Sequence, residues 1–168
     1  INHTVAAGGA NTYTYRDGQA VTWGVNPGAA ITLDISDGTS ATVAGSLSLT
    51  LSANTTSVLT IDNTGDEVDT LNVTASVAQT ALDIRADSTA TTGDTINLLG
   101  SKAYTVVAPG AGPVGLTALV LNGSAATGVI TATAAAAGAK SVIGGSAADV
   151  LTLTAGDAST SVSGGAGN

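Results

Sequence analysis

The residues of this chain that are best suited to chemistry are glycines and aspartates near its C-terminal end. Residues 141–168, SVIGGSAADVLTLTAGDASTSVSGGAGN, contain two Gly-Gly pairs twenty residues apart, each shortly preceded by Ser-Val. Glycine permits tight turns with positive φ, which expose carbonyl oxygens, and aspartate supplies a carboxylate. Oxygen atoms of both kinds are ligands of Ca²⁺. The segment therefore predicts a calcium site on glycine-rich turns.

The spacing of the first pair agrees with a known repeat. GGSAAD (Gly144–Asp149) followed by VLT has the spacing G-G-x-G-x-D-x-U-x, in which U is apolar and points inward. Ala147 stands at the third glycine, and the second repeat, GGAGN, would have its aspartate at position 169. We therefore expect one degenerate coil that leads into a calcium-binding region beyond the last residue. The expected ligands are Gly144, Ser146, Asp149, Asp157, Gly164, Ala166 and Asn168.

This C-terminal segment resembles the RTX repeats of proteins exported by Gram-negative type I secretion. The Ala/Thr/Ser/Val-rich run before it, without Cys and with two Lys, resembles bacterial surface-layer proteins and the large adhesins that carry such repeats. The resemblance implies a fragment of a longer, secreted protein of the bacterial cell surface, which self-assembles and requires calcium. We expect partners of two kinds: other copies, in a lattice or filament, and cell-surface polysaccharide through a region not present here.

Weaker candidates for cation binding are acidic residues in turns that lead into strands. They occur in TGDEVDTLNV (64–73) and TTGDTINLL (91–99), and they are Asp66, Glu67, Asp69 and Asp94. Turn and strand-start preferences explain aspartate at these positions equally well. Asp17 and Asp37 are expected only to shape hairpin turns.

Catalysis is not expected. His3 is the only histidine, the chain has no Cys, and neither H-E-x-x-H nor G-x-S-x-G occurs. Paired aspartates could hydrolyse glycosides, but such sites usually present aromatic rings to the sugar, and this chain has one Trp and three Tyr.

Charge excludes two classes of partner. The net charge is −8, with four Lys and Arg against twelve Asp and Glu. Because binding to nucleic acid or to an anionic membrane requires clustered basic residues, neither partner is expected. No apolar run approaches the roughly 20 residues of a membrane-spanning helix, so membrane insertion is not expected.

The pattern of small apolar residues predicts an all-β fold. Ser46–Ser52, SLSLTLS, alternates strictly between leucine and hydroxyl side chains. From Leu47 onward, apolar strands recur every 10 to 14 residues, with centres near Leu49, Leu59, Leu71, Leu82, Ile96, Val106, Leu119, Ile130, Val142 and Leu151. Paired into coils of 20–24 residues, this spacing favours a parallel β-solenoid, and a β-sandwich is the alternative.

The first 45 residues predict a different arrangement. The turns RDGQ (16–19) and SDGT (36–39) each separate two apolar stretches, as in antiparallel hairpins. We therefore expect three parts: antiparallel hairpins in 1–45, a solenoid-like region in 46–140 and the start of calcium-binding coils in 141–168. The expected function is a structural component of an extracellular surface layer. The alternative is a segment of an RTX adhesin or an ice-binding or cell-attachment module.

Overall fold

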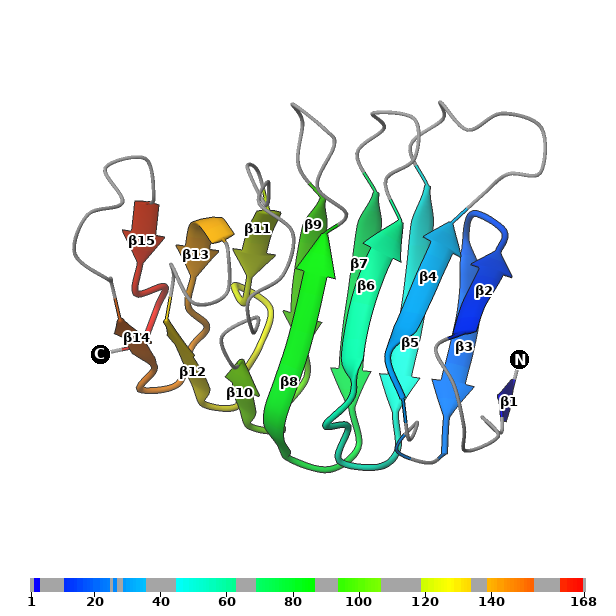
Figure 1. Ribbon diagram of the computed structural model, residues 1–168. Coiled ribbons are helices and arrows are strands. Elements are labelled where there is room, and N and C mark those ends of the chain that lie inside the picture. Colours follow the sequence, from blue (N-terminus) through cyan, green and yellow to red (C-terminus); the bar gives the residue numbers. More distant parts are fainter. Residues whose placement is uncertain are drawn as a thin grey trace.

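The computed structural model describes residues 2–3, 11–24, 26, 29–35, 45–62, 69–86, 94–106, 119–133, 139–152 and 161–167, and within these ranges it is all-β (Figure 1). The odd-numbered strands form an eight-stranded sheet: β1 (Asn2–His3), β3 (Gln19–Trp23), β5 (Ser46–Leu51), β7 (Thr70–Ala75), β9 (Thr95–Leu99), β11 (Leu119–Asn122), β13 (Ala139–Ile143) and β15 (Ser161–Ser163). The even-numbered strands form a seven-stranded sheet: β2 (Asn11–Tyr15), β4 (Ile31–Ile35), β6 (Val58–Asp62), β8 (Gln79–Ala86), β10 (Tyr104–Val106), β12 (Ile130–Thr133) and β14 (Val150–Thr152).

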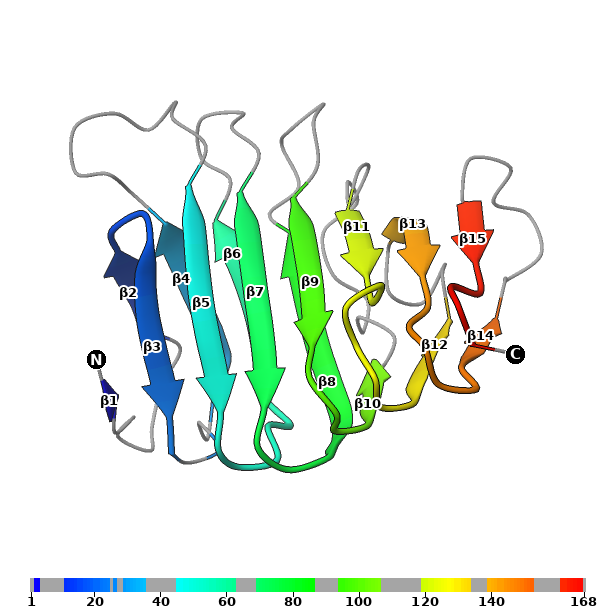
Figure 2. The ribbon, with the colours of Figure 1, turned by 180° about the vertical axis from the view of Figure 1, so that it is seen from behind.

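The chain winds as a parallel β-solenoid. Each strand pairs in parallel with the strand two further along, so the chain crosses to the opposite sheet after every strand. The two sheets face each other along the length of the stack (Figures 1 and 2). All ten strand centres expected from the apolar spacing lie within strands. The prediction of a parallel β-solenoid is confirmed.

The coils differ in length while most strand pairs keep one register; the register shifts between Tyr104 and Val106 in the β8–β10 pair and between Leu119 and Val120 in the β11–β13 pair. Thr70 pairs with Thr95, 25 residues later, whereas Asn11 pairs with Ile31 after 20 and Gln19 with Leu47 after 28. The difference lies in the connections between strands, which range from three residues (16–18) to twelve (107–118).

The expected antiparallel hairpins in residues 1–45 are wrong. β2 and β3 do not pair with each other, because the RDG turn carries the chain from one sheet to the other. Gly18 does adopt the expected positive φ, of 73°. β4 has parallel partners on both sides, β2 and β6, so neither of its edges is open to an antiparallel return strand. The second apolar stretch of the expected hairpin, residues 41–44 after the SDGT turn, lies outside the described residues.

The interior is built from rows of side chains that repeat from coil to coil. One row of the eight-stranded sheet runs Leu47, Leu71, Ile96, Leu121 and Val142, all of them buried. Burying such aliphatic side chains stabilises a fold by about 1.5–3 kcal/mol each. This is the thin, repetitive interior that a sequence with few aromatic residues predicts.

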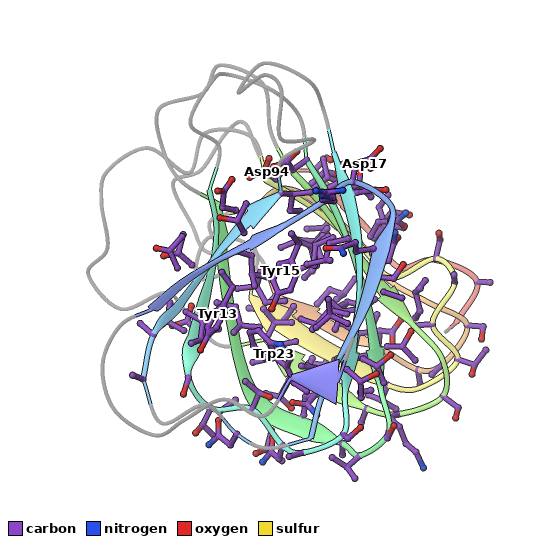
Figure 3. All side chains as sticks on the ribbon, turned by 90° about the vertical axis from the view of Figure 1, so that its right-hand side faces the viewer. Tyr13, Tyr15, Asp17, Trp23 and Asp94 are labelled. Atoms are coloured by element: carbon purple, nitrogen blue, oxygen red, sulfur yellow. The ribbon has the colours of Figure 1, made fainter. Side chains whose placement is uncertain are left out.

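Three of the four aromatic residues lie in the first coil. Tyr13 and Tyr15 have ring centroids 6.5 Å apart, and Figure 3 shows them and Trp23 between the two sheets. Trp23 is fully buried. These large rings fill the N-terminal end of the interior.

An asparagine ladder runs along the outer face of the eight-stranded sheet. Asn72, Asn97 and Asn122 are register partners on β7, β9 and β11. Nδ2 of Asn122 donates to Oδ1 of Asn97 at 2.9 Å, and Nδ2 of Asn97 donates to Oδ1 of Asn72 at 2.8 Å. The ladder couples three coils through side chains as well as through the main chain.

Candidate functional site

The glycine-rich turns at the C-terminal end stack directly on one another. Three turns, 123–129, 144–149 and 164–167, follow β11, β13 and β15 on the same side of the solenoid. The N–H of Ser146 donates to the carbonyl oxygen of Ala126 at 3.0 Å, and the N–H of Ala166 donates to that of Gly145 at 2.9 Å. Carbonyl oxygens in these turns therefore already accept hydrogen bonds from main-chain amides of the next coil.

Glycine is required here mainly for close approach of backbones. A Cβ on Gly144 would lie 2.6 Å from both Oδ2 of Asp149 and the carbonyl oxygen of Gly164. A Cβ on Gly145 would overlap the carbonyl oxygen of Ala126. Among the glycines of these three turns, only Gly165 has a positive φ, of 73°. Turn conformation therefore explains only part of the need for glycine at these positions, and close contact between backbones explains the rest.

The carboxylate of Asp149 joins two coils. Its Oδ1 accepts the N–H of Ile130 in the preceding coil at 2.8 Å, and its Oδ2 accepts the N–H of Gly145 in its own turn. Ile130 is the first residue of β12, and Gly145 lies in the turn that follows β13. Asp149 therefore caps two main-chain amides at a half-buried corner, where buried polar groups need hydrogen-bond partners.

In the N-terminal coils, side-chain amides form hydrogen bonds at the same corner, where the chain passes from the eight-stranded to the seven-stranded sheet. Oε1 of Gln79 accepts the N–H of Thr55 at 2.8 Å, and its Nε2 donates to the carbonyl oxygen of Ala53 at 3.0 Å. Asn54 forms a two-bond clamp with Thr80 in the next coil.

A second clamp of the same design joins Asn26 to Thr56, also in the next coil. Sequence reasoning missed these residues, although Asn or Gln recurring in turns about one coil apart was the available signal.

Asp69 and Asp94 lie at the opposite corner, immediately before β7 and β9. Both are fully buried. Oδ1 of Asp69 accepts the N–H of Gly45 at 2.8 Å, and Oδ1 of Asp94 accepts the N–H of Asp69 at 3.1 Å.

Asp17, near the same edge in Figure 3, accepts the N–H and hydroxyl group of Ser46. Asp69 and Asp94 therefore lie together at the starts of the neighbouring strands β7 and β9. Asp149 lies at the opposite corner.

The remaining predicted ligands divide into two groups. Ser146, Gly164 and Ala166 lie in the stacked turns with Gly144 and Asp149. Asp66, Glu67, Asp157 and Asn168 lie outside the described residues. Within the described ranges, no group of three or more His, Cys, Asp or Glu side chains is placed to hold a metal ion.

Comparison with known proteins assigns no family: no protein-family model, curated protein or solved structure matches this chain. In the parts of the chain that the structure covers, no helix has the length and apolar character needed to cross a bilayer.

Proposed function

We propose that this chain is a structural, self-assembling segment of an extracellular bacterial surface layer. The observation that carries the proposal is the parallel stack, in which main-chain ladders tie each strand to the next, a row of buried aliphatic residues runs from β5 to β13, and the asparagine ladder joins β7, β9 and β11. In such a solenoid each coil contacts only its neighbours, and the whole behaves as a rod. Polar side chains such as Asn54, Asn97 and Asp149 form hydrogen bonds between coils, which suits a protein that must resist mechanical force.

Calcium binding at the C-terminal turns is the second part of this proposal. Asp149 and the carbonyl group of Gly164 both approach Gly144, so the turn gathers oxygen atoms of the kind calcium prefers. Each carboxylate oxygen retains lone pairs beyond the amide it accepts. Extracellular calcium modules bind with a dissociation constant of about 10⁻⁴–10⁻³ M.

The calcium proposal is tested by thermal melting of the intact protein in EGTA and in about 10 mM CaCl₂. Calcium at ten times its dissociation constant adds about 1.4 kcal/mol of stability per site. For a chain of this size we expect the Tm to rise by about 3–5 °C for one site. Equal melting temperatures in the two buffers would contradict calcium binding.

Asp149→Asn separates the capping role from a calcium role. The asparagine oxygen can accept one of the two amides, but its NH₂ group faces the other as a second donor. We expect a lower Tm in EGTA from the lost cap and no further rise on adding calcium. A calcium-dependent rise equal to that of the unchanged protein would remove Asp149 from the site.

Assembly itself is tested by electron microscopy of the intact protein with and without calcium. We expect regular sheets or filaments in calcium. Monodisperse particles under both conditions would contradict the surface-layer proposal.

A further inference from the structure

Among the strand positions from β3 to β15 whose side chains the structure describes, the outer face of the eight-stranded sheet carries no charged side chain; Lys140 on β13 is not one of these positions. Because Leu47, Leu49 and Leu51 point inward, their neighbours along β5 point outward, and the register fixes the corresponding residues on the other strands. The outward-facing residues are Ala20, Thr22, Ser46, Ser48, Thr50, Thr70, Asn72, Thr74, Thr95, Asn97, Leu99, Val120, Asn122, Ser141, Ile143, Ser161 and Ser163. Figure 2 looks onto this surface, which we call the neutral face.

The absence of charge is unusual for this molecule. The chain carries a net charge of −8, and the opposite sheet has Asp34 on its outer face, where the Thr14 hydroxyl donates to the carboxylate at 2.9 Å. Two copies of an acidic protein repel least when they approach through a surface without charge. Depletion of charged residues is also what distinguishes the centre of a protein interface from other surface.

The composition of the neutral face suits contact with protein. Leu99, Val120 and Ile143 are half-buried aliphatic residues that face outward among hydroxyl and amide side chains. Thr22, Thr50 and Thr74 form one row across three strands, and each presents a methyl group beside its hydroxyl. Such a surface can bury apolar area while its hydroxyl groups bond with one another.

The area is large enough for a stable pair. The seven strands from β3 to β15, spaced about 4.8 Å apart and about five residues long, give a face of about 550 Å². Two such faces in contact would bury about 1,100 Å² in total, above the roughly 1,000 Å² of a specific interface.

We propose that the neutral face binds the same face of a second copy of this chain, in a two-fold symmetric pair. This pairing rests on the self-assembling function proposed above and supplies one of its contacts. In a two-fold interface each residue faces the same surface of the partner, so a single substitution acts on both sides at once.

The test is sedimentation velocity of the intact protein over a concentration series, with Thr95→Lys on the central strand of the face. Thr95 is half-buried between its register partners Thr70 and Val120. We expect a dimer for the unchanged protein and a dissociation constant raised roughly tenfold or more by Thr95→Lys, because like charges meet across the pair.

Thr32→Lys is the matched control. Thr32 is also half-buried and flanked by two paired strands, but it lies on the outer face of the seven-stranded sheet. We expect it to leave the dissociation constant within about twofold, since it adds the same charge to the other face. Melting followed by Trp23 fluorescence checks that both variants fold.

Mixing Thr95→Lys with Thr95→Asp provides an independent test. Opposite charges across the pair should restore dimers, which unfolding or non-specific repulsion would not produce. Equal weakening by Thr32→Lys and Thr95→Lys would overturn the proposal, as would a protein that is monomeric at every concentration. A monomer that instead binds ice crystals or cell-wall glycan through this face would overturn it too.

The pairing and the proposed function fail in different ways. Dimers in solution without sheets or filaments under the microscope would contradict the surface-layer function and leave the pairing intact. Sheets formed by a protein that does not dimerise would overturn the pairing and leave the function intact.

Discussion

Tyr104 shows how one side chain joins the two sheets across the interior. It lies on β10, is fully buried, and its hydroxyl is 2.8 Å from the carbonyl oxygen of Leu99 and 3.2 Å from that of Val73. Both carbonyl groups belong to strands of the opposite sheet. Burial raises the pKa of Tyr104. Burial also raises the pKa of Tyr15.

These tyrosines make the free energy of unfolding depend on alkaline pH. A pKa above the usual 10.0 in the folded state means that folding favours the protonated form. This contribution is complete below pH 10 and is lost as the pH rises through the folded-state pKa. We expect urea denaturation followed by Trp23 fluorescence to show lower stability near pH 11 than near pH 8.

Tyr104→Phe assigns part of that loss to one residue. The ring stays buried, but the hydroxyl bond is gone, which costs about 1 kcal/mol at neutral pH. We expect the variant to lose less stability between about pH 8 and about pH 11, with Tyr15 accounting for the remainder. An alkaline loss as steep as that of the unchanged protein would show that Tyr104 does not contribute.

Much of the candidate site could be predicted at the level of residue types. The Gly-Gly pair and its following aspartate identify Gly144 and Asp149 as special, and the structure places them in one turn. What the sequence could not provide is the partner of each carboxylate oxygen. One of them is the N–H of Ile130, which is distant in sequence and comes close only because two coils stack.

At the level of elements, glycines in two stacked turns have opposite roles. Gly145 lies against the carbonyl group of Ala126 in the coil beneath, whereas nothing lies within 4 Å of the Cβ position of Gly164. Gly164 also lacks a positive φ, so alanine fits its backbone without strain.

We expect Gly145→Ala to lower the free energy of unfolding by roughly 1–3 kcal/mol, because its methyl group must push two backbones apart. Gly164→Ala should be neutral or stabilising by up to about 1 kcal/mol, through a less flexible unfolded chain. Urea denaturation of the two variants in parallel checks both expectations. Equal losses would mean that turn flexibility, and not the distance between backbones, explains these glycines.

The strands themselves were predictable, but their partners in the N-terminal part were not. Alternation of apolar and polar residues marks a strand wherever one face is buried, as in β5 and β7, whereas β8 has three consecutive buried residues, Leu82, Asp83 and Ile84. The Asp17-Gly18 turn has the positive φ that its sequence predicts. A turn of this conformation can form a hairpin or can carry the chain from one sheet to the other. Which of these arrangements forms depends on the burial of aliphatic rows, whose members are far apart in sequence.

At the scale of the whole molecule, burial is uneven along the stack. β5 and β7 alternate fully between buried and outward-facing residues, whereas β14 and β15 contain no fully buried residue, and Val150 is 55% exposed. In a stack held by nearest neighbours, coils with less buried surface open at lower cost.

We therefore expect hydrogen exchange, followed by mass spectrometry, to be slowest for amides of β5, β7 and β9. Exchange should be fastest for β14 and β15, since fewer buried contacts oppose their opening. Uniform exchange across all coils would show instead that the solenoid unfolds in a single cooperative step.

The difference in length between coils bears on how the sequence of such a chain can change in evolution. Register is kept between β9 and β11 although twelve residues connect β10 to β11, and between β2 and β4 although only three connect β2 to β3. Insertions and deletions at the bends therefore leave the stacked interior as it was. A lineage can vary what it displays at these bends while inheriting an unaltered frame, so sequence similarity would fade at the bends well before the architecture is lost.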